Sequence, residues 1–144
     1  MRKPRVFLDS SVIVAALLSS RGGSFYVLTQ LNDRCAFRIN EYVLAEMQDV
    51  LTTKFRKHPA LLSHFFLFLG LYDIETLKDP SRREVERMSS VVSKKDAPIL
   101  ASAIEHSDYL VTLDNEFLSP RVLRVANMRG LTILKPGDLI ALFH

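Results

Sequence analysis

Short apolar runs alternate along the 144-residue chain with longer stretches whose apolar residues recur at helical spacing. The short runs are rich in β-branched and aromatic residues and predict strands at 6–8, 35–39, 72–77, 109–113 and 131–134. The longer stretches predict helices at 10–18, 25–32, 40–51, 59–69, 83–92 and 122–127. Two further helices are predicted to begin at residues 96 and 136. Strands therefore alternate with helices throughout, which predicts an α/β fold with a parallel sheet and helices on both faces.

Two of these helices have recognisable starts. Asn40 is a favoured N-cap residue, and Glu41 follows in the first turn, where a carboxylate is favourable. Asp96-Ala97-Pro98 places an aspartate at a cap and a proline in the first turn. Neither a repeat nor a low-complexity linker interrupts the pattern, so residues 1–144 are expected to form a single domain.

The composition fits this picture: hydrophobic residues make up 48% and charged residues 24%, as in ordinary globular proteins. The most apolar stretch, 63–71, is shorter than the roughly 20 residues of a membrane span. A basic N-terminus precedes an apolar run, but Asp9 interrupts that run, which argues against a secretory signal. The single cysteine, Cys35, excludes an internal disulfide and a cysteine-based zinc site. Together these features predict a cytoplasmic protein that does not enter a membrane.

The net charge is +3 and the pI about 9.2, which alone says little about partners. Basic residues gather at Lys54–Lys57, Arg82–Arg83, Lys94–Lys95 and Arg121–Arg129. Any one of these clusters is explained by a solvated helix end. Several of them on a chain that also carries a cluster of acids favour a nucleic-acid partner.

Two apolar strands end in the same way: Val6-Phe7-Leu8 leads into Asp9, and Leu110-Val111-Thr112-Leu113 leads into Asp114. In an open parallel sheet, ligands bind outside the carboxyl ends of the strands. Asp96, at a helix start, is expected on the same edge. Glu46 lies two turns into its helix between core positions, and a carboxylate there requires a partner.

Carboxylates that converge in one cleft repel one another, and their oxygen atoms suit Mg²⁺ or Mn²⁺. A metal-bound water can then attack a phosphodiester while the ion offsets charge on the phosphate. This chemistry requires no G-x-S-x-G motif or paired histidines, and the chain has neither. Each acid also has a structural alternative: Asp9 and Asp96 as helix caps, Glu46 as a surface residue and Asp114 as part of a turn.

With these residues identified, the chain resembles the PIN-domain nucleases over nearly its whole length. Four segments carry the resemblance: Val-Phe-Leu-Asp-Ser-Ser at 6–11, Asn-Glu-Tyr-Val-Leu-Ala-Glu-Met at 40–47, Lys-Asp-Ala-Pro-Ile-Leu-Ala-Ser-Ala at 95–103 and Leu-Val-Thr-Leu-Asp-Asn-Glu-Phe at 110–117. The resemblance implies a Rossmann-like, three-layer α/β/α sandwich with a short, mostly parallel sheet. It also implies a ribonuclease that cleaves single-stranded RNA and depends on Mg²⁺ or Mn²⁺.

The resemblance assigns catalytic positions to four acids: Asp9, Glu46, Asp96 and Asp114. The three aspartates are expected to hold the metal directly or through water, and Glu46 to complete the shell or orient the attacking water. Hydroxyl and acidic residues at supporting positions near the metal are Ser10, Ser11, Thr112 and Glu116. For the three hydroxyl residues, plain turn or strand roles remain an equal alternative. For Glu116, a solvated position in the turn is favoured over a supporting role.

Within the family, the chain is most similar to VapC-like toxins of toxin–antitoxin pairs, which implies an antitoxin protein as partner and a homodimer. Asn40 replaces a serine often found at that cap, a conservative change. Lys94-Lys95-Asp96-Ala97 lacks the additional acids that often flank the third carboxylate. We therefore expect at most one tightly held ion without substrate.

Three alternatives remain open. The first is a housekeeping PIN-fold ribonuclease in RNA processing or decay, which the absence of a neighbouring antitoxin gene would favour. The second is a non-catalytic PIN-like module that binds RNA or protein, although all four acids are retained. The third is a phosphate-accepting α/β domain that uses Asp9, which the matching motif at Asp114 disfavours.

Overall fold

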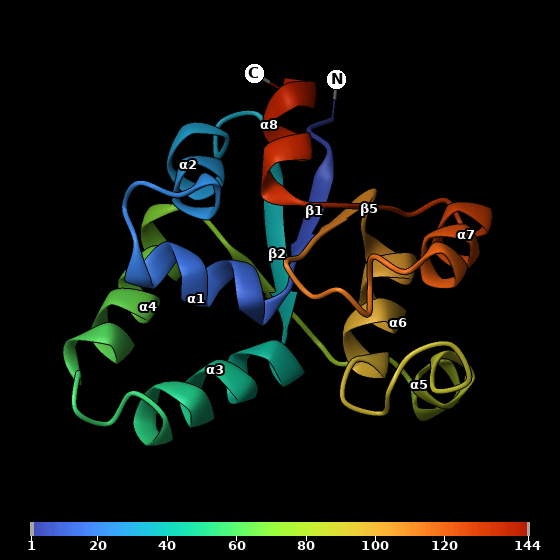
Figure 1. Cartoon of the computed structure of the whole chain (residues 1–144), viewed down its shortest axis with the longest axis horizontal. Coiled ribbons are helices and arrows are strands. Elements are labelled where there is room, and N and C mark those ends of the chain that lie inside the picture. Colours follow the sequence, from blue (N-terminus) through green and yellow to red (C-terminus); the bar gives the residue numbers. More distant parts are fainter. Residues whose placement is uncertain (1, 144) are drawn as a thin grey trace.

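The computed structural model describes residues 2–143. Its centre is a parallel five-stranded sheet, with the strands in the order β3-β2-β1-β4-β5 (Figure 1). The strands are β1 (Arg5–Leu8), β2 (Ala36–Asn40), β3 (Glu75–Leu77), β4 (Tyr109–Val111) and β5 (Thr132–Leu134). The short parallel sheet that the sequence predicts is confirmed.

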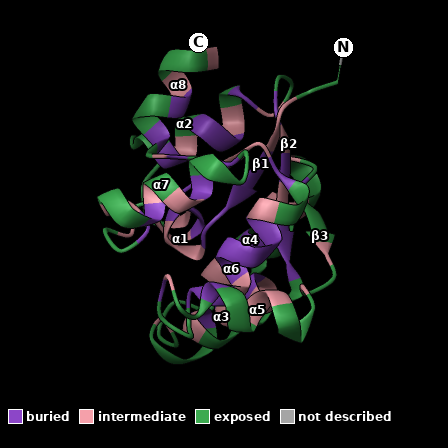
Figure 2. Ribbon diagram, turned by 90° about the vertical axis from the view of Figure 1, so that its right-hand side faces the viewer, coloured by how far each residue is buried: buried purple, intermediate pink, exposed green. Residues whose placement is uncertain are grey.

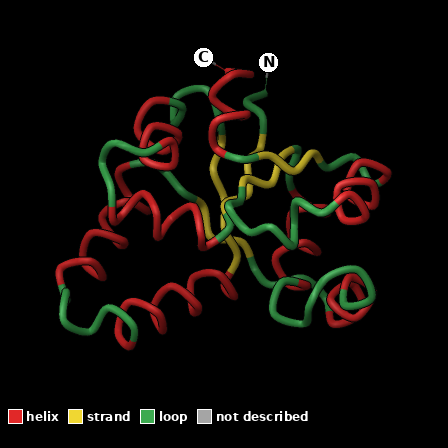
Figure 3. The backbone as a smooth tube through the Cα atoms, viewed as in Figure 1, coloured by secondary structure: helices red, strands yellow, loops and turns green. Residues whose placement is uncertain are grey.

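Helices cover both faces of the sheet, which forms the middle layer (Figures 1 and 3). One side carries α1–α4, with α8 packed against α2, and the other carries α5–α7. The helices are α1 (Ser10–Leu18), α2 (Gly23–Gln30), α3 (Glu41–Thr53), α4 (Ala60–Leu71), α5 (Arg82–Met88), α6 (Ala97–His106), α7 (Pro120–Met128) and α8 (Pro136–Phe143). This is the predicted three-layer α/β/α sandwich.

The core lies on both faces of the central strand β1. Val6, Phe7 and Leu8 are completely buried, because a central parallel strand is covered by helices on each side (Figure 2). The edge strand β3 is largely exposed and only three residues long. The first strand is therefore rigidly held, and the residue that follows it has a well-defined position.

Three predicted elements are shorter in the structure by two or more residues. The strand predicted at 72–77 begins only at Glu75, because Asp73 adopts a left-handed backbone with φ of 55°. The helix predicted at 83–92 ends at Met88, where the hydroxyl of Ser89 donates to a helix carbonyl. The strand predicted at 109–113 ends at Val111, so Asp114 lies three residues beyond it rather than directly at its end.

Asn40 caps α3, as predicted, and also ties α3 to α6. Its side chain accepts from the Val43 N–H at 2.9 Å and donates to Ser102 Oγ at 2.8 Å and to the Pro98 carbonyl at 3.1 Å. Because Asn40 is completely buried, none of these partners is replaced by water. The residue thereby sets the position of α3 relative to α6.

Asn40→Ala should lower the free energy of unfolding by about 2 kcal/mol, since it removes a helix cap and leaves buried polar groups unpaired. Ser81→Ala is a matched control, because Ser81 caps α5 through Glu84 N–H at an exposed site. That variant should lose at most about 1 kcal/mol. Urea denaturation measures both. Equal losses would mean that the link from Asn40 to α6 adds nothing to stability.

Within residues 2–143, no single helix is both long and apolar enough to cross a membrane. In the part of the chain that the structure describes, α1 and α2 taken together reach the required length and composition, and they are bent by 96° with respect to each other.

Candidate functional site

The chain reverses its direction of winding at β1. The strands that follow β1 first run to one side as β2 and β3, and then to the other side as β4 and β5. The crevice between the carboxyl ends of β1 and β4 is the topological switch point, where open α/β sheets bind ligands. Asp9 follows β1 directly and Asp114 follows β4, so both predicted residues lie at this crevice.

Asp9 is almost fully buried and occupies the N-cap position of α1, yet its side chain does not cap the helix. Instead, Oδ2 accepts hydrogen bonds from Ser11 Oγ at 2.8 Å and Thr112 Oγ1 at 2.7 Å. Burial raises the pKa of Asp9, and the charges of Glu46 and Asp114 add to that, while the two hydroxyl donors lower it. The carboxylate is thus held in a fixed orientation without capping the helix.

The two hydroxyls also connect Asp9 to the loop after β4. Ser11 Oγ accepts from the Leu113 N–H at 3.1 Å, and Thr112 Oγ1 accepts from the Asp114 N–H at 2.9 Å. Any shift of Asp9 would therefore move the backbone that carries Asp114. Ser10, the other predicted serine, lines the pocket described below.

Asp96 occupies the N-cap position of α6, and it also makes no capping hydrogen bond. Burial, a hydrogen bond with Glu116 and the charge of Asp114 raise the pKa of Asp96 to about 8. Glu116 accepts from Ser93 Oγ at 2.9 Å and from the Ser93 N–H at 3.3 Å, which fixes it beside Asp96. Glu116 thus supports Asp96 from an exposed position in the turn.

Glu46 and Asp114 complete the acidic group. Glu46 is half-buried on α3, and within residues 2–143 its Oε1 is buried with no hydrogen-bond partner. Asp114 Oδ1 accepts from the Glu116 N–H at 2.9 Å, so one of its oxygens serves the turn. Asp114 therefore takes part in the turn, as the structural alternative proposed. Its second carboxylate oxygen, Oδ2, is not used by this hydrogen bond.

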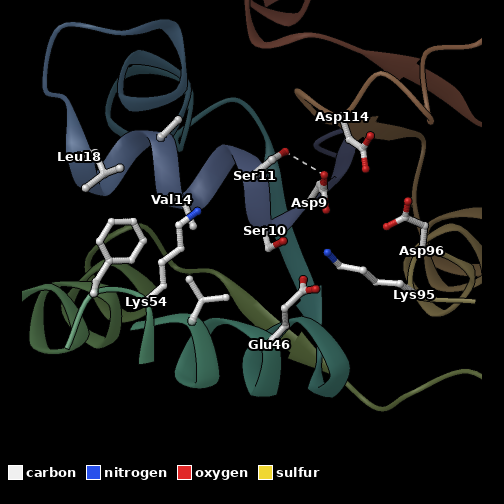
Figure 4. Close-up of a pocket in the computed structure, with 13 residues that line it drawn as sticks. Asp9, Ser10, Ser11, Val14, Leu18, Glu46, Lys54, Lys95, Asp96 and Asp114 are labelled. Carbon is white, nitrogen blue, oxygen red and sulfur yellow. Dashed lines mark hydrogen bonds between the residues drawn. The ribbon is translucent and has the colours of Figure 1, made fainter. Parts of the chain in front are cut away.

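All four acids line one pocket of about 570 Å³ at the crevice (Figure 4). Figure 4 shows the ammonium of Lys95 directed between Ser10 and Glu46, and Lys54 extending toward α1 near Val14. The remaining lining residues are Ser11, Ala15, Leu18, Val50 and Phe55. An acidic centre flanked by two lysines suits a polyanion whose reacting phosphate needs a cation.

Whether the residues suit a divalent cation can be tested on the donor atoms. Within the described chain, no three His, Cys, Asp or Glu side chains converge closely enough to form a metal site as they stand. The donors around the pocket are carboxylate oxygens, and a buried Glu46 oxygen without a partner is a group that a cation would satisfy. Mg²⁺ keeps several waters and often uses only one or two carboxylates, so this donor set fits it.

The apolar part of the pocket is not apparent from the sequence. Val14 and Leu18 on α1, with Val50 and Phe55 from the α3 side, resemble core positions in the sequence. Only the packing of α1 against α3 turns them into walls of the pocket. Ser93, the partner of Glu116, had no signal in the sequence at all.

With the geometry described, comparison with known proteins identifies the family. Residues 6–123 match the family model described as the PIN domain. The chain belongs to the PIN domain family. PIN domains are generally nucleases, and all four acids of this PIN domain fall within the matched region. No curated protein matches the chain in sequence.

Solved structures share the fold at low sequence identity. One is a chain of VapBC2 from Rickettsia felis, crystallised with a DNA fragment from its promoter: 21% identity over 91% of this chain and 98% of that chain, with a TM-score of 0.66. Another is PAE2754 from Pyrobaculum aerophilum: 18% identity over 99% of this chain and 98% of that chain, with a TM-score of 0.68. These likenesses show that the PIN fold extends over nearly all of the chain.

Proposed function

We propose that this PIN domain is a metal-dependent endoribonuclease that hydrolyses single-stranded RNA. The proposal depends mainly on two buried aspartates, Asp9 and Asp96. Each occupies the N-cap position of a helix, but neither side chain makes a capping hydrogen bond. Burying a carboxylate is costly unless it is paired or binds a cation, and neither of these two carboxylates is used to cap its helix. Both residues open onto the pocket that Glu46 and Asp114 also line.

In this proposal, Asp9, Asp96 and Asp114 hold Mg²⁺ or Mn²⁺, directly or through water. When bound, the ion lowers the pKa of a coordinated water and offsets charge on the phosphate. Glu46, whose Oε1 has no protein partner among the described residues, would complete the shell around the ion or orient the attacking water. Lys95 binds a phosphate oxygen of the substrate strand, which positions the RNA without reading its sequence.

Thr112→Val tests whether the orientation of Asp9 matters. Valine keeps the size of threonine but removes the hydroxyl that donates to Asp9 Oδ2 and accepts from the Asp114 N–H. Cleavage should fall about 10- to 100-fold, as is typical when a partner of a metal ligand is removed. Single-turnover cleavage measures this, and Thr76→Val on the exposed edge strand β3 is the matched control. A Thr112 variant as active as that control would mean that this bond does not position Asp9.

The substrate class is tested with the purified chain on three labelled oligonucleotides in Mg²⁺ or Mn²⁺: single-stranded RNA, the same RNA annealed to its complement, and single-stranded DNA. We expect internal cleavage of the single-stranded RNA and little cleavage of the other two. Binding of RNA without cleavage under any metal condition would support a non-catalytic module instead.

We further propose that the chain is a single-domain, cytoplasmic toxin that an antitoxin protein neutralises. The similarity of its motifs to VapC-like toxins supports this, together with the fold that it shares with a chain of VapBC2. A homodimer is supported by α4, where Phe65 is buried but Phe66, Leu67 and Leu71 are 45%, 54% and 59% exposed. Apolar side chains of this size on one helix are typical of a surface that another chain covers.

A further inference from the structure

The acidic pocket continues beyond the carboxylates as a groove between α1 and α3. On α1, Ser11, Val14 and Leu18 share one helical face. On the α3 side, Glu46, Val50 and the capping residue Lys54 follow at intervals of four residues. The α1 wall therefore changes from polar to apolar residues with distance from the carboxylates (Figure 4). The α3 wall runs from Glu46 past Val50 to Lys54. We call this the α1–α3 groove.

The far end of the α1–α3 groove combines an aromatic ring with an ammonium group. Phe55 is half-buried, and Lys54 Nζ lies 5.8 Å from the centre of its ring. In the described chain, no carboxylate oxygen lies within 4.0 Å of Lys54 Nζ. Leu18 on the facing wall is 55% exposed. The end of the groove thus offers an apolar platform with an ammonium that no protein acid neutralises.

This combination fits a nucleotide better than an extended peptide. A base stacks on aromatic and apolar surface, and a lysine binds the phosphate of the same nucleotide. An extended peptide would bring backbone N–H and carbonyl groups that need hydrogen-bond partners. The far walls offer none from their side chains apart from Lys54.

We propose that the α1–α3 groove is a subsite for the nucleotide adjacent to the cleaved phosphodiester. The base lies against Phe55 and Leu18, and Lys54 binds the phosphate on its far side. Because these wall side chains present no amide or hydroxyl to a base edge, the subsite accepts any base. This inference rests on the proposed ribonuclease function, which supplies the strand that continues from the carboxylates into the groove.

The test measures binding of a fluorescently labelled, single-stranded hexanucleotide RNA in Ca²⁺ by anisotropy, at several salt concentrations, alongside cleavage in Mg²⁺. Lys54→Gln and Phe55→Leu should each weaken binding about three- to tenfold. Lys54→Gln should also lower the salt dependence, the slope of log affinity against log salt, by roughly 0.7. Lys3→Gln, at an exposed residue, and Phe143→Leu, at a half-buried one, lie outside the groove and should stay within about twofold of wild type in affinity. Thermal melts verify folding, and Lys54 is exposed enough to serve alone if Phe55→Leu is unstable.

The outcomes separate this inference from the proposed function. If wild type cleaves RNA but Lys54→Gln and Phe55→Leu bind as tightly as the controls, the subsite is wrong and the ribonuclease stands. If wild type neither binds nor cleaves RNA, both are wrong. If the two variants leave RNA affinity unchanged but weaken a protein partner, the groove is a peptide-binding site and the nucleotide assignment is overturned.

Discussion

Asp9→Asn should reduce cleavage of single-stranded RNA about a thousandfold, the effect of losing roughly 4 kcal/mol of transition-state stabilisation. Asparagine has the same shape and can still accept from Ser11 and Thr112, so the loop after β4 should keep its position. What it removes is the charge that would hold the cation. Asp96→Asn should reduce the rate to a similar extent for the same reason.

Asp49→Asn is the matched control for these two variants. Asp49 is exposed on α3, one turn from Glu46, and does not line the pocket. Its replacement should leave the rate within about twofold of wild type. If Asp9→Asn loses no more activity than Asp49→Asn, the buried carboxylate has no part in the reaction.

Without divalent cations, the protein should become less stable as the pH rises from about 4 to about 8, and Asp96 should account for much of the loss. Burial, with the nearby Glu116 and Asp114, raises the pKa of Asp96 to about 8 in the folded protein, against 3.8 for an ordinary aspartate. Below pH 3.8 the Asp96 carboxyl group is protonated in both the folded and the unfolded protein, so it does not change the stability. Between the two values only the folded state holds the proton, so stability falls with pH until the folded group also ionises.

Asp96→Asn should therefore match wild type in thermal stability near pH 4 and exceed it near pH 8. A gain of roughly 5 °C corresponds to about 1.5 kcal/mol in a domain of this size. Asp108→Asn is a control for which the opposite change in stability is expected. Burial tends to raise the pKa of Asp108, but the hydrogen bonds and the charge of Arg5 lower it overall. That variant should lose stability at neutral pH. A thermal melt series in EDTA checks both, and a gain for Asp96→Asn that is the same at every pH would contradict the explanation.

Much of the site is readable from the sequence because its determinants are local. The continuous apolar run Val6-Phe7-Leu8 is typical of a central, buried parallel strand. Asp9 follows this run, so it is predicted at the carboxyl end of that strand. Asn40 and Asp96 mark helix starts through their residue types and their neighbours. No local sequence feature marks Glu46, so its prediction depends on the motifs that resemble the family. In the structure, Glu46 lines the same pocket as the three aspartates.

What the sequence does not reveal depends on how elements pack. Asn40 is visible as a cap, but its link to Ser102 joins residues 62 positions apart. Phe55 and Leu18 are ordinary apolar residues until α1 and α3 face each other. The displacement of Asp114 beyond β4 results from the bond between its own N–H and Thr112 Oγ1, a side-chain contact that competes with strand pairing.

Titrating Mn²⁺ into metal-depleted protein tests whether the acidic pocket holds a divalent cation that is used to cleave RNA. Calorimetry follows binding while cleavage of single-stranded RNA is measured in the same samples. We expect a single binding event, cleavage that rises with it and is abolished by EDTA, and loss of both in Asp9→Asn and Asp96→Asn. Undiminished cleavage in EDTA, or unchanged Mn²⁺ binding in both variants, would contradict the assignment of the pocket.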